Sequence, residues 1–186
     1  MEERYGEQVA FDAHIFDLSL KNLKTREAVS IQQSATIADA LKAMQAHYIG
    51  AIIVVNENNQ VVGIVSERDI VMKALGQIDN YETQPVTEIM TPNPVCLHLE
   101  DSIRYLMNKM HVGHYRHVPI VDDQGHPVAV STVRHVVEYI LDQFPASEVM
   151  HLPIEPYRGV VGRDGGWSIF AQGENAKFAE LASRNS

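Results

Sequence analysis

The chain has 186 residues, of which 45% are hydrophobic and 21% are charged, and its formal net charge is −9. This composition is that of an ordinary globular protein. The sequence contains no run of about 18 apolar residues, so no membrane span is predicted. The acidic balance disfavours a nucleic-acid surface but permits one small anion beside a basic group such as Arg68, Lys73 or Arg116. The single cysteine, Cys96, and the lack of a secretory signal predict a cytoplasmic protein without an intrachain disulfide.

Ala28–Leu75 aligns with Pro94–Leu141 without a gap, so the chain contains two copies of one unit. With the residues before and after the copies, we expect four segments along the chain. A repeat of this length usually closes its core only against its neighbour, so the two copies should pack together and leave clefts in which ligands bind. Residues 24–80 and 81–145 are the two predicted domains, and residues 146–186 are a tail. Residues 1–23 form an N-terminal segment expected to pack on the pair through Val9, Phe11, Ile15, Phe16, Leu18 and Leu20.

Each copy predicts the order strand, helix, strand, strand, helix. In the first copy the elements are expected at Ala28–Ile31, 36–47, Ala51–Val55, Val61–Val65 and Glu67–Leu75. In the second copy they are expected at Val95–Leu97, from a cap at Asp101 or Ser102 to Met110, and at His117–Val121, Pro127–Val130 and Val133–Phe144. The last helix of the first copy should bury Ile70, Val71 and Ala74, and residues 76–86 should be a polar surface linker.

The strongest short motif is Gly63–Asp69, Gly-Ile-Val-Ser-Glu-Arg-Asp, at a predicted strand-to-helix junction. Ser66 occupies the position of a helix N-cap, where backbone N–H groups attract anions, and Asp69 lies in the first turn. The Asp69 carboxylate can accept from both hydroxyls of a cis-diol such as ribose, and Arg68 adds a positive charge for a phosphate. Ser-x-x-Asp is also a capping arrangement that merely starts a helix, so the motif alone leaves both interpretations open.

Other motifs stand in order around this one: Gly50–Val55, Glu88–Pro92 and Tyr115–Asp122. With the tandem β-α-β-β-α pattern, they resemble a cystathionine-β-synthase (CBS) domain pair over roughly residues 20–144. The resemblance implies an α+β fold of two domains packed with pseudo-twofold symmetry, and often a disc-shaped dimer of two pairs. It also implies a regulatory module that binds AMP, ADP, ATP or S-adenosylmethionine in a cleft between the domains.

Carried over to this sequence, the resemblance predicts one convincing ligand cleft. Asp69 would bind the ribose hydroxyls, and Ser66 and Arg68 would lie near the phosphate. The remaining wall would come from the second copy. There, Thr91, Pro92 and Val95 would flank the adenine, and Arg116 and His117 would approach the phosphate.

The symmetric cleft departs from this pattern, because Asp69 aligns with His135 and Ser66 with Thr132. An imidazole forms at most one hydrogen bond per nitrogen and cannot replace a carboxylate as a two-oxygen acceptor, although Thr132 can still cap the helix. We therefore predict weak or no nucleotide binding there. His135 is expected to face solvent; the alternative is that it titrates in the cleft and makes any residual anion binding depend on pH. The expected lining of this second cleft is Val29, Ile49, Gly50, Ala51, Thr132 and His135.

Two other kinds of site are expected to be absent. His111, His114 and His117 resemble a metal-ligand run, but Gly113 should end the helix here and send the three rings in different directions. No nucleophile–base arrangement or Walker loop predicts catalysis or a catalytic cofactor.

The sequence thus predicts a non-catalytic, homodimeric sensor of adenine nucleotides, suited to energy sensing, that signals to a client protein by a conformational shift. Nucleic acid and membranes are not expected partners. The alternative interpretation is a structural or oligomerisation module whose ligand clefts are degenerate.

Overall fold

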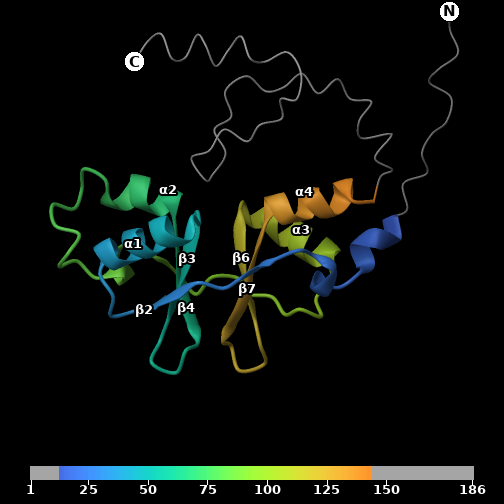
Figure 1. The fold of residues 1–186 in the computed structure, drawn as a ribbon, viewed down its shortest axis with the longest axis horizontal. Coiled ribbons are helices and arrows are strands. Elements are labelled where there is room, and N and C mark those ends of the chain that lie inside the picture. The colour runs from blue at the N-terminus through green and yellow to red at the C-terminus, as the bar shows by residue number, and fades with distance from the viewer. Residues whose placement is uncertain (1–12, 144–186) are drawn as a thin grey trace, which may run out of the picture. The chain divides into compact units, whose positions relative to one another are not determined.

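The computed structural model describes residues 13–143, so the predicted anchors Val9 and Phe11 and the predicted tail lie outside the described residues. Within 13–143, the strands form two sheets (Figure 1). The first sheet has the order β2-β3-β4-β5, with strands at Ser30–Gln32, Ala51–Val55, Val61–Ser66 and Thr91–Pro92. The second has the order β1-β7-β6, with strands at Arg26–Glu27, Pro127–Thr132 and His117–Val121. β2 is parallel to β3, and the other pairs are antiparallel.

The helices begin where the sequence supplies caps. The α-helices are α1 (Ile37–His47), α2 (Glu67–Asp69), α3 (Ile103–Gly113) and α4 (Val133–Leu141). Short helical turns lie at Ala13–Asp17 (η1), Leu20–Asn22 (η2), Ile70–Ala74 (η3) and Val86–Glu88 (η4). Thr36, Ser66 and Thr132 each form a capping box with the residue three positions later, and Ser102 caps α3. These bonds satisfy backbone N–H groups that the first turn leaves without a helical partner.

Four local expectations need correction. Val86, the last residue of the predicted surface linker, begins η4 and is fully buried in the first core. The predicted helix Glu67–Leu75 is α-helical only to Asp69 and continues as the π-helical turn η3. Its inward positions are Ile70 and Ala74, four residues apart, so Val71 is turned outward and is 58% exposed rather than buried. The predicted strand Val95–Leu97 is reduced to a single bridge between Leu97 and Ile120.

Each copy has its own hydrophobic core, and each core is completed by a segment that precedes the other copy. The first core lies between α1 and its sheet and also contains Val86 and Ile89. The second lies beneath α3 and α4 and also contains Leu20 and Leu23. In the same way β5 extends the first sheet and β1 the second, covering the outer edges of β4 and β7. The packing therefore crosses the predicted boundary between residues 80 and 81.

The sheet faces turned away from the helices are buried as well. Along β3, Ile52 and Val54 belong to the first core, while Ile53 and Val55 lie on the opposite face and are equally buried. The β3–β4 and β6–β7 hairpins lie side by side with the helices on the outside (Figure 1). At the hairpin tips, the Val61 N–H donates to the Gly125 carbonyl at 3.0 Å. The two copies thus meet through the bare faces of their sheets.

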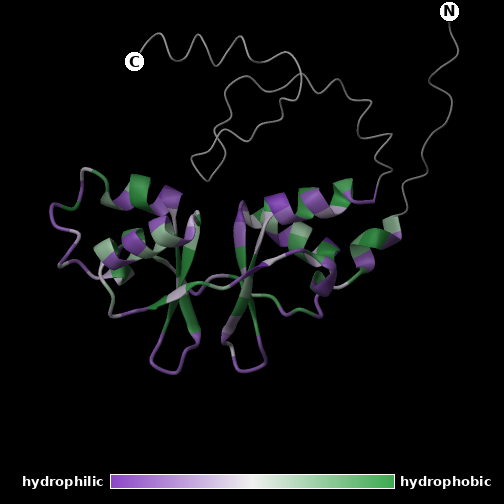
Figure 2. Ribbon diagram, in the orientation of Figure 1, coloured by the Kyte–Doolittle hydropathy of each residue, from purple (hydrophilic) through white to green (hydrophobic). Residues whose placement is uncertain are grey.

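The distribution of hydropathy agrees with this arrangement. The strands β3 and β4 are mostly hydrophobic, β6 and β7 are mixed, and both hairpin tips are hydrophilic (Figure 2). Within residues 13–143, no helix is both long enough and apolar enough to cross a membrane.

Candidate functional site

The site predicted from the sequence lies at one end of the two facing sheets. Ser66, the last residue of β4, pairs with Ala51, and Thr132, the last residue of β7, pairs with His117. Because side chains alternate along a strand, Ser66 lies on the same bare sheet face as Ile53. His117 and Thr132 lie on the bare face of the other sheet by the same alternation. The beginnings of α2 and α4 and the beginning of β6 therefore border the interface between the copies.

The Asp69 carboxylate is held by hydrogen bonds on both oxygens. Oδ2 accepts from the Ser66 N–H at 2.9 Å and from the Ser66 hydroxyl at 2.6 Å. Oδ1 lies 2.7 Å from the Lys73 ammonium nitrogen and accepts from the Thr91 hydroxyl at 3.3 Å. The Asp69 side chain is only 13% exposed. The structure thus joins Asp69, Ser66 and Thr91 and adds Lys73. Thr91 and Pro92 form β5 of the first sheet, so the expectation that they belong to a wall from the second copy is wrong.

These neighbours determine the ionisation of Asp69. Burial acts to raise the pKa of Asp69, but the hydrogen bonds from Lys73 and Ser66 and the positive charge of Lys73 outweigh it. The pKa therefore lies below its ordinary value, and Asp69 is a carboxylate at neutral pH. An ionised carboxylate only accepts hydrogen bonds, which is what a diol requires of its partner.

Lys73 is the one member of this cluster that the sequence did not predict as a site residue. Its ammonium donates to the Ile89 carbonyl at 2.9 Å and is 3.5 Å from the Met90 carbonyl. Asp69 and Lys73 are four residues apart, the spacing at which side chains on one helical face meet. The four-residue spacing could have indicated the ion pair between Lys73 and Asp69. The hydrogen bond from Lys73 to the Ile89 carbonyl could not be predicted in this way, because it depends on where η4 packs.

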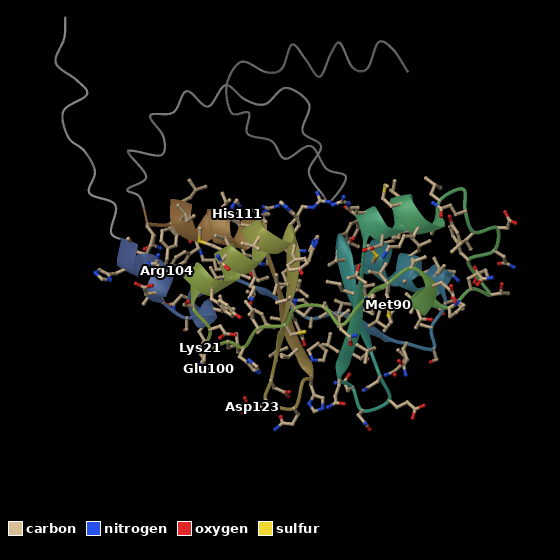
Figure 3. All side chains as sticks on the ribbon, turned by 180° about the vertical axis from the view of Figure 1, so that it is seen from behind. Lys21, Met90, Glu100, Arg104, His111 and Asp123 are labelled. Atoms are coloured by element: carbon tan, nitrogen blue, oxygen red, sulfur yellow. The ribbon has the colours of Figure 1, made fainter. Side chains whose placement is uncertain are left out.

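The remaining predicted residues do not join this cluster. Pro92 pairs with Gly63, and a Cβ on Gly63 would contact the sulfur of Met90, labelled in Figure 3, so that the flexible Met90 side chain would have to move. Val95 is half-buried. Arg68 and Arg116 are exposed, and neither side chain has a hydrogen bond or ion pair to another residue between 13 and 143.

The equivalent helix start in the second copy also has a capping box, but with His135 in place of the aspartate. The Thr132 N–H donates to His135 Nδ1 at 3.2 Å, and the His135 N–H donates to the Thr132 hydroxyl at 3.3 Å. His135 is 8% exposed, so the expectation that it faces solvent is wrong. The reason is that the imidazole takes the place of the carboxylate in the capping box, which holds the ring against the first turn of α4.

The other residues predicted for the second cleft are already packed. Val29 and Ile49 are half-buried against the first core, and Ala51 is buried. Gly50 is buried, and the Glu67 carboxyl carbon lies 3.4 Å from the position that a Cβ on Gly50 would take. This places an acidic group beside the predicted wall.

A metal centre finds no support in the described part of the chain. Gly113 ends α3, as predicted, and His114 follows in the left-handed conformation with φ 54°. His111 is exposed on α3 (Figure 3), whereas His117 begins β6 and is half-buried. Among residues 13–143, no group of three or more His, Cys, Asp or Glu side chains is placed to hold a metal ion.

Two copies of a helix, β-hairpin and helix unit meet through their bare sheet faces, with a capped helix beginning at each side of the interface, and so define a tandem-domain module. The CBS domain family model matches residues 20–76 and 86–142. The chain therefore belongs to the CBS domain family and contains two CBS domains, which confirms the predicted α+β fold of a CBS pair.

Individual relatives agree with this assignment. The CBS domain-containing protein CBSCBSPB5 of Arabidopsis thaliana is 33% identical over 171 residues, which cover 89% of this chain and 30% of that protein. The chain thus spans less than a third of the length of this curated relative.

Solved structures show the same fold. The CBS domain pair of protein MJ0100, solved with 5′-methylthioadenosine and S-adenosyl-L-methionine, has a TM-score of 0.61 and 25% identity, covering 68% of this chain and 98% of that one. A CBS domain protein from Pyrobaculum aerophilum, complexed with AMP, has a TM-score of 0.59 and 24% identity, with coverage of 73% and 98%.

Proposed function

We propose that this protein is a non-catalytic regulatory module that binds an adenine nucleotide or another adenosyl ligand at Asp69. The observation that carries the proposal is the ionised, largely buried Asp69 carboxylate, held at the border between the two CBS domains. The adenosyl ligands of the two solved relatives support the same ligand class. Binding in such a cleft would favour one arrangement of the two domains and so signal to a client protein.

Within this proposal each predicted residue has a distinct role. Asp69 accepts the ribose hydroxyls. The adenine lies against Thr91, Pro92 and Val95. Ser66 and Arg68 from the first domain, and Arg116 and His117 from the second, surround the phosphate or its replacement. A ligand held by groups from both domains is what makes the relative position of the domains sensitive to binding.

The direct test is thermal unfolding of the full chain with AMP, ADP, ATP and S-adenosylmethionine. A ligand at a hundred times its Kd stabilises the folded state by about 2.7 kcal/mol. Asp69→Asn should lose this stabilisation for the ligand that binds. Asp39→Asn is the matched control, because Asp39 forms the same capping box with Thr36 on α1, away from the interface between the sheets. The proposal fails if no adenosyl ligand raises the unfolding temperature, or if both variants reduce the effect equally.

We also propose that two copies of the chain associate through α2–η3 and α4. Each carries apolar side chains that are exposed at equivalent positions, with exposed fractions of 58% for Val71, 64% for Leu75, 46% for Val137 and 44% for Leu141. Apolar patches of this kind are common at protein interfaces. Analytical ultracentrifugation should show a dimer for the natural sequence and a monomer for Val71→Lys with Val137→Lys.

The alternative function, a structural module with degenerate clefts, is favoured by one observation. His135 stands where the second cleft would need a carboxylate. A chain that dimerises but binds none of the four ligands would establish this alternative. The cytoplasmic location and the identity of the client protein stay predictions.

A further inference from the structure

Lys73 ties the proposed ribose-binding carboxylate to the segment that leads into the second domain. Its ammonium lies 2.7 Å from Asp69 Oδ1, 2.9 Å from the Ile89 carbonyl oxygen and 3.5 Å from that of Met90. An ammonium has three hydrogens to donate, and these contacts account for all of them. Ile89 is fully buried in the first core, and Met90 is followed directly by β5. Lys73 therefore helps to fix segment 86–92 on the first domain.

The same bond places Lys73 in competition with a ligand. A carboxylate has about four acceptor positions, and Asp69 uses them for two contacts from Ser66, one from Lys73 and one from Thr91. The Ser66 contacts belong to the capping box that starts α2. A diol must therefore take the positions on Oδ1, which means displacing the long contact with Thr91 and then the ammonium of Lys73.

The second domain has an equivalent tie that is built differently. The repeat places Tyr139 at the position of Lys73, and the Tyr139 hydroxyl donates to the Ile15 carbonyl at 3.0 Å. In both domains this helical position thus bonds to the backbone of a segment outside the helix, and in the first domain the same side chain also contacts the carboxylate that would bind a ligand.

We propose that Lys73 is the residue through which occupancy of Asp69 controls segment 86–92. A ribose diol on Asp69 displaces the ammonium, weakens its hold on the Ile89 and Met90 carbonyls, and loosens η4 and β5. Because this segment leads into the second domain, its release is how ligand binding changes the relation between the domains. The inference rests on the proposed function and adds a specific residue for signal transmission.

The test uses Lys73→Met, which removes the ammonium and keeps a flexible apolar stem. Adenosine is the first probe, because it has the diol and lacks the phosphate that a lysine would attract. We expect Lys73→Met to bind adenosine several-fold more tightly than the natural protein does, measured by calorimetry. Lys42→Met is the matched control, since Lys42 forms an ion pair with Glu82 on the first domain at 3.3 Å and should leave the affinity unchanged.

The second measurement is hydrogen exchange of the Ile89 and Met90 amides, which both donate to the Val86 carbonyl. AMP should speed their exchange several-fold in the natural protein. In Lys73→Met the exchange should already be fast and should not respond to AMP. Lys73→Gln, which also removes the ammonium charge but keeps a polar side chain, should likewise lose the response to AMP, and it provides a second variant if Lys73→Met does not fold.

The outcomes separate the two proposals. If AMP binds the natural protein and Asp69→Asn abolishes binding, but adenosine affinity and the two amides do not respond to Lys73→Met, the role of Lys73 is wrong and the proposed function stands. Weaker AMP binding with unchanged adenosine binding would make Lys73 a phosphate contact and also overturn the inference. If AMP does not bind at all, both proposals fail.

Discussion

The first turns of α2 and α4 have the same capping box but differ in one of its side chains. Ser66 with Asp69, and Thr132 with His135, form capping boxes of the same geometry on equivalent strands. A carboxylate oxygen and an imidazole nitrogen both accept the N–H of the capping residue, so helix initiation tolerates the exchange. Diol binding does not, because it needs two acceptor oxygens. The comparison teaches that the fold constrains the cap, while the ligand chemistry depends on one side chain.

The largest expected effect is on ligand affinity, when Asp69 of the first domain is replaced by the histidine found at the equivalent position of the second. Asp69→His should keep the capping box but reduce affinity for the adenosyl ligand by roughly 10- to 100-fold, because hydrogen bonds to a charged group contribute about 1.5–3 kcal/mol. Calorimetry measures the affinity, and circular dichroism checks that the helices remain. Unchanged affinity in a folded variant would mean that Asp69 does not bind the ribose.

A second contrast lies one residue before each cap. Val65 belongs to the first core, whereas the equivalent Ser131 is fully buried and its hydroxyl has no hydrogen-bond partner among residues 13–143. A buried hydroxyl without a partner costs about 1–3 kcal/mol. Ser131→Val should therefore raise the free energy of unfolding by about 1–2 kcal/mol in urea titrations, and the reverse change, Val65→Ser, should lower it. Destabilisation by Ser131→Val would show that the hydroxyl has a partner that this geometry does not reveal.

The caps themselves should contribute similar stability in the two domains. Ser66→Ala and Thr132→Ala each remove the side-chain acceptor for the backbone N–H at the third helical position. Each should reduce the free energy of unfolding by about 1 kcal/mol, the usual contribution of an N-cap. Chemical denaturation of the two variants in parallel measures this directly. A much larger loss for Ser66→Ala would mean that Asp69 depends on Ser66 for its position, and not only α2.

The smallest effect concerns pH. Because the folded pKa of Asp69 is lowered, its contribution to stability is fully present above the unfolded pKa, near 3.9, and is lost as pH falls through the folded pKa. The stability difference between the natural protein and Asp69→Asn should therefore shrink on acidification below about pH 4. Urea unfolding from pH 7 to pH 3 measures it. A difference that stays constant would show that Asp69 has an ordinary pKa.

Much of the fold could be predicted because helix caps and strand patterns depend on residues that are close in the sequence. Thr36 begins α1 as predicted, Ser102, one of the two predicted caps, begins α3, and the β-branched run Ala51–Val55 forms a strand buried on both faces. The internal repeat indicated two copies, and the order of their motifs indicated the family. The capping box of Ser66 and Asp69 could be predicted for the same reason, since it needs only neighbouring positions.

The tertiary structure decided what depends on distant parts of the chain. The packing of Val86 and Ile89 on the first core, and of Leu20 and Leu23 on the second, follows from which sheet edge each segment covers, and no local pattern specifies that edge. The reach of Lys73 to Ile89 and of Thr91 to Asp69 depends on the same packing. By itself, the sequence determined that the two helix starts differ in one side chain. Only the fold decided that Lys73, which contacts Asp69 Oδ1, also bonds to the backbone of segment 86–92. Hydrogen bonds between distant residues form only once the chain has packed.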